Sequence, residues 1–267
     1  MKIIFSRKGY DLDYGKYPSI ILPSSQMLSF PIPSEKDELG FFSSQLFIGE
    51  DSLSDVFSDL QHKNTEISHH LDPDLGFYTI NKVVSKTIGT FGQVGSAAGH
   101  LENQEVNIGD IFLFFGTFQF TKYNNGRLEY LKNEIPFHAL FGYLVIDKVI
   151  KNVKEIPKNV EHQHLIHHLH FLNKEHKSYF NKKNYIYIGK KFGRFKFSDK
   201  IRLSAKKSNK SLWSLPVFFK DIPISYHNGR GEVINDKFML PTVGKGQEFV
   251  FTATKQIEEW IDQLISE

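Results

Sequence analysis

The apolar runs of this sequence are short, and their length restricts its fold more than any other feature. The longest, residues 111–115 and 139–146, have the length of β-strands. A membrane-spanning helix needs about 20 apolar residues, and a secretory signal needs an apolar core of about seven or more. Near its start the chain has only a short apolar run, Ile3-Ile4-Phe5. We therefore expect a cytoplasmic protein without a membrane span, with strands in its core.

Aromatic residues supply much of the apolar content. The sequence contains 25 Phe and 11 Tyr among 267 residues. A chain of this length and composition buries a sizeable core instead of remaining disordered. The sequence has no Cys, which excludes disulfides, thiolate-bound zinc and a cysteine nucleophile. The absence of Cys also fits a reducing cytosol.

Strand-like and helix-like segments are mixed along the chain. Strands are expected at residues 2–5, 111–120, 139–150, 185–188, 215–219 and 248–252, and a hairpin turn is expected at Asn124-Asn125-Gly126. Apolar residues at helical spacing predict helices at residues 52–60 and 257–264, the second at the C-terminus. The sequence shows no internal repeat and no linker. We therefore expect one domain over residues 1–267, with an α+β fold, a mixed, partly barrel-like sheet and flanking helices.

Short motifs of polar and small residues follow one another in a particular order. In chain order they are Ser6-Arg7-Lys8-Gly9-Tyr10-Asp11 with Pro18-Ser19, Leu28-Ser29-Phe30-Pro31-Ile32-Pro33, His70-Leu71-Asp72-Pro73-Asp74, Phe91-Gly92-Gln93-Val94-Gly95-Ser96-Ala97-Ala98-Gly99-His100-Leu101, Gly109-Asp110-Ile111-Phe112-Leu113-Phe114-Phe115-Gly116, Ser225-Tyr226-His227 and Gly246-Gln247-Glu248-Phe249-Val250. Together they resemble the third type of nucleotide modification associated domain, over nearly the whole chain. The resemblance implies a setting of base modification and phage conflict, without a defined activity. Residues 192–199 and 228–236 depart from the family pattern.

A second resemblance concerns architecture alone. A short helix, then Gly109-Asp110 and an aromatic strand, and then the returning strand at residues 139–146 are similar to the barrel of PUA-like domains. Those domains include modules that read bases. Because a fold hosts many functions, this analogy concerns the expected sheet and not the activity.

The loop after the first strand carries side chains suited to a phosphate. Arg7 and Lys8 stand beside a glycine and could hold a phosphate, while Asp11 could orient a sugar hydroxyl or act as a base. Tyr14 belongs to the same candidate nucleotide site. The alternative is a surface loop with a local ion pair.

A second candidate site is the small-residue segment 92–100. Backbone N–H groups before a helix could approach an anion, Gln93 and Ser96 could bind a base edge, and His100 could act as a general base. The segment matches neither the dinucleotide fingerprint nor the P-loop. The alternative is tight packing of a helix on a sheet. Since Arg7 suits phosphate and Gln93 suits a base, we expect the two loops to meet in one nucleotide-sized pocket.

Acidic residues and histidines raise the question of a metal ion. Asp72 and Asp74 follow two histidines and could bind a hard cation or share acid–base work. Asp-Pro-Asp is also a favourable turn, and a turn is what we expect. Five further histidines stand at His162, His164, His167, His168 and His170. Two of them are four residues apart, as on a metal-binding helix, but no evident set of three or four ligands exists. We therefore expect no metal ion.

The basic segment, residues 174–210, is the most strongly charged part of the chain. It contains 11 Lys and 2 Arg against two acidic residues, interleaved with Phe and Tyr. Basic and stacking side chains together suit single-stranded nucleic acid. The alternative is a solvated strand whose aromatic side chains face the core. The residues expected to contact nucleic acid are Lys182, Lys183, Lys190, Lys191 and Arg194.

Recognition or modification of a nucleotide, or of a base in nucleic acid, accounts best for these features. An enzyme would transfer protons with His100 and one of Asp11, Asp72 or Glu248. Glu248 could equally cap its strand or pair with Lys245. A binding module would read a modified base without chemistry, and a sensor would bind a free nucleotide. The expected partners are nucleotides or nucleic acid, not membranes, while the cofactor and the oligomeric state stay unknown.

Overall fold

The apolar runs of the sequence become strands in the computed structural model, which describes residues 1–10, 15–34, 39–83, 88–158, 165, 168–173, 183–227, 231–242 and 248–266. The chain forms two compact units. Unit 1 contains Met1–Phe30, Asp110–Tyr143 and Gly193–Glu267, and unit 2 contains Pro31–Gly109 and Leu144–Phe192. The expectation of one domain over residues 1–267 stays a prediction.

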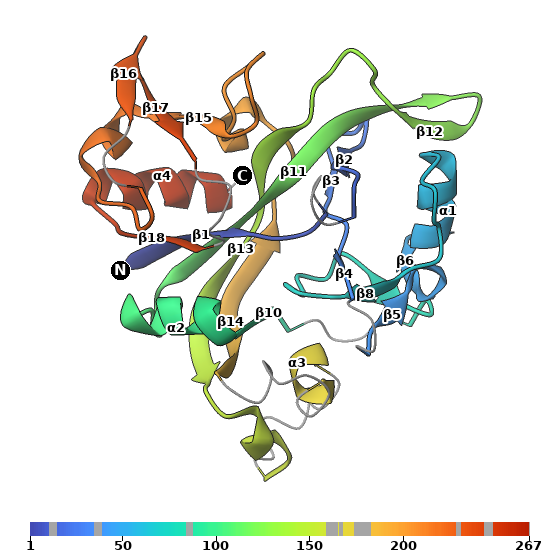
Figure 1. The fold of residues 1–267 in the computed structure, drawn as a ribbon, viewed down its shortest axis with the longest axis horizontal. Coiled ribbons are helices and arrows are strands. Elements are labelled where there is room, and N and C mark those ends of the chain that lie inside the picture. The colour runs from blue at the N-terminus through green and yellow to red at the C-terminus, as the bar shows by residue number, and fades with distance from the viewer. Residues whose placement is uncertain are drawn as a thin grey trace. The chain divides into compact units, whose positions relative to one another are not determined.

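The main sheet of unit 1 combines strands from both ends of the chain. Its strand order is β13 (Phe137–Ile150), β11 (Ile111–Asn124), β1 (Lys2–Arg7) and β18 (Glu248–Thr252) (Figure 1). β1 is parallel to β11 and antiparallel to β18, so the sheet is mixed. The first eight residues of β11 are all buried. Because both faces of this strand are covered, its sequence is a continuous apolar run without alternation.

The later part of β11 pairs with two more strands. β2 (Ser19–Ile21) lies parallel to it and also pairs with β3 (Met27–Leu28), while β12 (Arg127–Tyr130) forms an antiparallel hairpin with it. The hairpin turn is Asn125-Gly126, with φ of 49° and 81°. Asn and Gly tolerate such positive φ angles at both central turn positions. The hairpin expected at this Asn-Gly sequence is therefore confirmed.

An aromatic core lies under the C-terminal helix of unit 1. Helix α4 (Lys255–Ser266) buries Ile257, Ile261 and Leu264, and its Trp260 ring lies 6.4 Å from the Phe5 ring. A three-stranded sheet stands nearby, in the order β15 (Leu212–Pro216), β17 (Lys237–Pro241), β16 (Glu232–Ile234). The strand expected at residues 215–219 ends earlier, at Pro216, and continues as the 3-10 helix η5 (Val217–Asp221). Proline has no N–H with which to extend a strand ladder. A second short 3-10 helix is η4 (Asp199–Ile201).

Unit 2 contains the other end of β13 and several short elements. β10 (Thr90–Val94) is antiparallel to β14 (Asn184–Arg194), which is followed in sheet order by β13. Two small sheets have the orders β4 (Ile32–Pro33), β8 (Ser68–His70), β5 (Phe41–Phe42) and β7 (Asp51–Ser52), β6 (Leu46–Ile48), β9 (Thr79–Ile80). The described helical elements of unit 2 include η1 (Ser43–Gln45), α1 (Leu53–Asp59), α2 (Gly95–Asn103), η2 (Val153–Lys158) and α3 (Leu169–Leu172).

The expected helix near residue 52 shows how the sequence sets a boundary. Ser52 accepts a hydrogen bond from the Asp55 N–H, and the Asp55 carboxylate accepts one from the Ser52 N–H. This reciprocal capping box satisfies backbone donors that the first turn leaves open. Helix α1 therefore starts directly after Ser52.

The α+β fold, the mixed sheet and the C-terminal helix expected from the sequence are confirmed. A partly barrel-like, PUA-like sheet is consistent with this strand arrangement. In the described part of the chain, no helix combines the length and the apolar character needed to cross a bilayer.

Candidate functional site

Several motif residues lie in two polar clusters, one in each unit. We call the first the ion-pair cluster; its members are Lys8, Glu248 and the motif Ser225-Tyr226-His227, all in unit 1. We call the second the His–Asp cluster; its members are His70, Asp72 and His170, all in unit 2. Each cluster combines segments that are far apart in the sequence.

A buried salt bridge forms the centre of the ion-pair cluster. Lys8 follows β1 and extends its pairing, because its N–H donates a hydrogen bond to the Phe115 carbonyl at 2.8 Å. The Lys8 Nζ atom lies 3.2 Å from Glu248 Oε1, and the two side chains are only 5% and 1% exposed. Glu248 thus has Lys8 as a charged partner; residue 245, the other partner considered, lies outside the described residues. The roles of Lys8 in phosphate binding and of Glu248 in catalysis stay predictions.

The Ser225-Tyr226-His227 motif is held against β18 beside Glu248. The Ser225 N–H donates to the Val250 carbonyl, and the Val250 N–H donates to Ser225 Oγ at 2.8 Å. The His227 ring packs on Phe249, with ring centres 4.9 Å apart. Partial burial, and then the negative charge of Glu248, raise the pKa of Tyr226. The motif therefore gathers polar groups around the end of β18.

The sequence reasoning missed His138, a buried histidine in unit 1. Its Nδ1 atom accepts a hydrogen bond from the Trp213 indole N–H at 3.0 Å, so the ring carries its proton on Nε2. Burial, and then the positive charges of Arg7 and Lys210, lower the pKa of His138 to about 3. The ring is therefore neutral at physiological pH. A single histidine in an apolar strand gave no sign of this contact.

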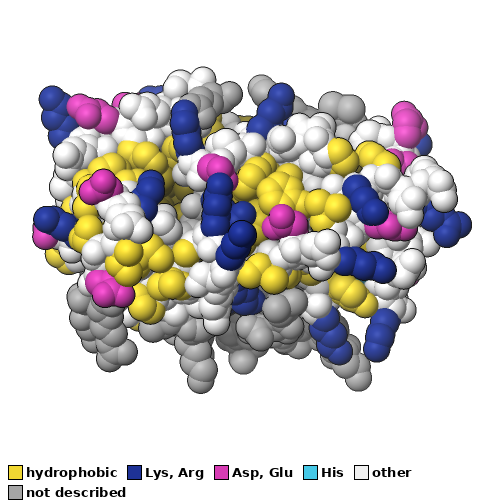
Figure 2. Space-filling model, turned by 90° about the horizontal axis from the view of Figure 1, so that it is seen from above, with side chains coloured by type: hydrophobic (Ala, Val, Ile, Leu, Met, Phe, Trp, Pro, Cys, Tyr) yellow, Lys and Arg dark blue, Asp and Glu magenta, His cyan; other side chains and the backbone are white. Residues whose placement is uncertain are grey.

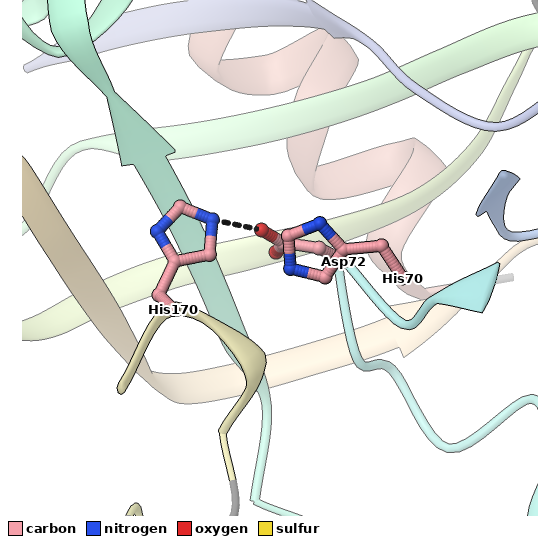
Figure 3. Close-up of side chains that lie close together, drawn as sticks. All are labelled: His70, Asp72 and His170. Carbon is pink, nitrogen blue, oxygen red and sulfur yellow. Dashed lines mark ion pairs between the residues drawn. The ribbon is translucent and has the colours of Figure 1, made fainter. Parts of the chain in front are cut away.

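The His–Asp cluster joins a loop to a distant helix. His70 ends β8, Asp72 follows two residues later, and His170 lies in α3. One possible ligand atom from each of the three side chains lies within 4.8 Å of the others. Figure 3 shows the His70 and His170 rings close to the Asp72 carboxylate, and His170 Nε2 is 2.9 Å from Asp72 Oδ2. The Asp72 and His170 side chains are 5% and 4% exposed.

Neighbouring groups fix the orientation of both partners in this pair. The Gly92 N–H donates to Asp72 Oδ1 at 2.8 Å, which leaves Oδ2 directed at His170. Asn184 Oδ1 lies 2.8 Å from His170 Nδ1, and the Asn184 amide N–H₂ group donates to the His170 carbonyl. Because Asn184 Oδ1 can only accept, His170 Nδ1 carries a proton.

Electrostatics favour a charged carboxylate in the His–Asp cluster. Burial pushes the pKa of Asp72 upwards, but its hydrogen bond with His170 and the charges of the nearby histidines outweigh burial and keep the pKa below its usual value. His168, whose ring is 5.5 Å from that of His170, has its pKa lowered to about 4, chiefly by burial. Burial also raises the pKa of Asp74, whose carboxylate accepts a hydrogen bond from the Gly76 N–H.

The second predicted loop is a strand followed directly by a helix. Gln93 lies buried in β10, and its Oε1 atom accepts a hydrogen bond from the Val94 N–H. Ser96 is exposed and His100 is half-buried, one turn apart in α2. Arg7 belongs to unit 1 and Gln93 to unit 2, so the shared pocket stays a prediction. Asp11 and Tyr14 lie outside the described residues.

The described part of the basic segment contains both core and surface residues. Tyr185, Tyr187 and Phe195 are buried, which supports the interpretation that these aromatic rings face the core. Lys190, Lys191 and Arg194 are exposed. Lys183 pairs with Glu102, and Lys182 and the histidines 162, 164 and 167 lie outside the described residues. On the face shown in Figure 2, basic side chains are interspersed with acidic and apolar ones.

The helices and the mixed sheet place the chain in the α+β class of proteins. Within it, the chain belongs to the family of nucleotide modification associated domain 3, whose sequence model matches residues 2–252. The resemblance seen in the motifs is thereby confirmed. No curated protein and no solved structure shows a significant match. Membership links the chain to nucleotide modification.

Proposed function

We propose that this protein modifies a base of a nucleotide or nucleic acid, with the His–Asp cluster as its reaction centre. The observation that supports the proposal is the 2.9 Å contact between His170 Nε2 and the buried Asp72 carboxylate, with the His70 ring beside it. Asp72 and Gly92, which donates to it, stand in two of the motifs that carry the resemblance to the family. The contact joins two motifs that are 20 positions apart in the sequence.

The arrangement suits proton transfer. A carboxylate beside imidazoles can hold the rings in one orientation and stabilise their charged form. Asp72 and Asn184 engage both ring nitrogens of His170, so His70 would be the ring that exchanges a proton with a substrate. Burial excludes water and strengthens each electrostatic interaction. The His70 ring, which is only partly buried, would be the member of the cluster that reaches a substrate.

The surface and the family suggest where such a substrate comes from. Lys190, Lys191 and Arg194 offer exposed positive charge for a phosphate backbone. Modification of a nucleotide fits the family name. DNA as the substrate, and a setting of phage defence in the cytoplasm, are further parts of the proposal.

A second candidate function is recognition of a modified base or free nucleotide without turnover. The low exposure of Asp72 and His170 favours this alternative, because a buried ion pair can simply orient a loop. The two functions differ in whether product forms.

Mass spectrometry tests both functions on the full chain. Ligands retained on purification are identified first, and the protein is then incubated with nucleotides, single-stranded DNA and RNA. We expect a base of altered mass, lost in Asp72→Asn and retained in Asp74→Asn, a matched change two residues away. Binding without any altered base would favour the recognition module. If the altered base still forms with Asp72→Asn, the His–Asp cluster is not the reaction centre.

A further inference from the structure

We propose that His70, Asp72 and His170 together bind one divalent transition-metal ion. The sequence led us to expect no metal, because neither the Asp72 loop nor the later histidines offer enough ligands alone. In the structure, a carboxylate and an imidazole from the loop meet an imidazole from α3, with ligand atoms within 4.8 Å of one another. The ion would occupy the side chains of the proposed reaction centre, so the inference deepens the proposed function; ion binding and turnover are measured separately.

The contact between His170 and Asp72 requires a cation. Asn184 Oδ1 can only accept a hydrogen bond, so the proton of a neutral His170 ring is on Nδ1. The lone pair of Nε2 then points at Asp72 Oδ2, 2.9 Å away, where two acceptors face each other. A proton between the two atoms, on the ring or on the carboxyl group, or a metal ion relieves this conflict.

The His70 ring favours the metal ion over the proton. A protonated His170 paired with Asp72 needs no further imidazole, yet the His70 and His170 ring centres are 5.2 Å apart. The His70 Nε2 atom is shielded from solvent. Two imidazoles gathered on one carboxylate form the donor set of a two-histidine, one-carboxylate metal site.

Nearby His168 is not one of the ligands. Its Nδ1 atom accepts a hydrogen bond from the His170 N–H, so the neutral ring carries its proton on Nε2. It has no lone pair left for an ion. Among the described residues, the donor set therefore consists of three side chains.

The surroundings of the cluster match those of metal ligands. A ligating histidine usually donates its other ring N–H to an oxygen, as His170 does to Asn184. A ligating carboxylate is usually hydrogen-bonded in turn, as Asp72 is by the Gly92 N–H. Gly92 also makes room for the ring, because a Cβ atom there would lie 2.4 Å from His170 Cδ2. Both ligands are thus oriented by groups outside the donor set.

The donor set indicates the class of ion. Imidazole nitrogens suit zinc and iron, whereas calcium and magnesium prefer oxygen ligands. Three protein ligands leave a position for water or substrate, as in catalytic zinc sites. In a four-coordinate zinc site with bonds of about 2.0–2.1 Å, ligand atoms are about 3.4 Å apart. The ligand atoms of the His–Asp cluster now lie up to 4.8 Å apart. Binding of a zinc ion therefore requires the side chains to move by roughly 1 Å.

Metal titration of chelator-treated protein tests the proposal. We expect about one equivalent of Zn²⁺ per chain by elemental analysis, and a Co²⁺ absorption spectrum typical of low coordination number. Zn²⁺ binding should weaken at least tenfold in each of the variants His70→Gln, Asp72→Asn and His170→Gln. Circular dichroism spectra check that each variant is folded. His138→Gln, which alters a buried histidine of unit 1, should leave it unchanged.

A second measurement avoids variants that fail to fold. Long-range ¹H–¹⁵N spectra of the wild-type imidazoles, recorded during Zn²⁺ titration, should show shifts at two rings that Mg²⁺ does not cause. A wild-type protein that binds no stoichiometric Zn²⁺ or Co²⁺ would overturn the proposal. So would binding that survives His70→Gln and Asp72→Asn but is lost when His162, His164 and His167 are all replaced by Gln.

Discussion

Replacing Lys8 by Met should reveal what the buried salt bridge of unit 1 contributes. The change keeps a side chain of similar length and removes the charge 3.2 Å from Glu248, which is 1% exposed. Breaking a buried pair in this way costs about 3–5 kcal/mol, because the remaining charge stays in a poor solvent. The carboxylate can escape the cost only by taking up a proton.

The cost of that proton sets an upper limit for the loss of stability. A carboxyl group with an ordinary pKa of about 4.3 costs about 3.7 kcal/mol to protonate at pH 7, but only about 1 kcal/mol at pH 5. The Lys8→Met protein should therefore lose about 3–4 kcal/mol of unfolding free energy at pH 7. It should lose much less at pH 5, because the folded state of the variant binds the proton more readily than the unfolded state.

Urea unfolding followed by tryptophan fluorescence reports on unit 1, which contains the salt bridge. Both tryptophans, Trp213 and Trp260, lie in unit 1. Replacing Lys8 and Glu248 together by Met should restore most of the loss, since an apolar pair of similar volume often substitutes for a buried ion pair. Lys206→Met breaks an exposed pair and serves as the control. A loss below about 1 kcal/mol at pH 7, or one equal at both pH values, would refute the reasoning.

Three further predictions concern packing, pH and charge. The Cβ atom of Gly92→Ala would clash with the His170 ring, so this variant should lose Zn²⁺ binding and about 1–3 kcal/mol of stability in thermal unfolding. Normal Zn²⁺ binding by this variant would contradict the proposed metal site. His138 has a pKa of about 3 when folded and an ordinary value of about 6.5 when unfolded. As the pH falls, the unfolded state takes up a proton on this histidine first, so the free energy of unfolding should decrease between about pH 6.5 and 3. The decrease should be less steep in His138→Gln. Equal slopes of unfolding free energy against pH for the two proteins, measured by urea titration, would contradict this. Binding of single-stranded DNA should weaken steeply with salt, and a flat salt dependence would exclude a phosphate contact. Reversing the charges of four lysines should weaken DNA binding further, as measured by fluorescence anisotropy; they are Lys182, Lys183, Lys190 and Lys191.

Much of the fold could be predicted because its determinants are local. Apolar runs gave β11 and β13, an Asn-Gly pair gave the hairpin turn, and an apolar stripe gave α4. The end of β15 at Pro216 was missed, since the following phenylalanines extend the apolar run without extending the ladder. The small sheets of unit 2 have strands of two or three residues, too short for any periodicity.

The candidate sites depend on contacts that sequence order hides. Asp72 and Gly92 stood out in separate motifs, but the hydrogen bond that joins them became visible only in the structure. His170 was one of five clustered histidines, but its partner in the structure is Asp72. Its spacing to the other four histidines therefore gave no information about this contact. Lys8 and Glu248 are 240 positions apart, so no local pattern could pair them.

The pairing of β1 with β18 has a consequence for how this chain is made. Residues 2–7 leave the ribosome long before residues 248–252, which form one of their two neighbouring strands. Until then β1 can pair only with β11, and its free edge exposes N–H and C=O groups beside the apolar residues Ile3, Ile4 and Phe5. Such an edge invites pairing with other chains. Slow translation of the last third of the message should therefore lower the yield of folded protein, and chaperones that shield nascent chains should raise it.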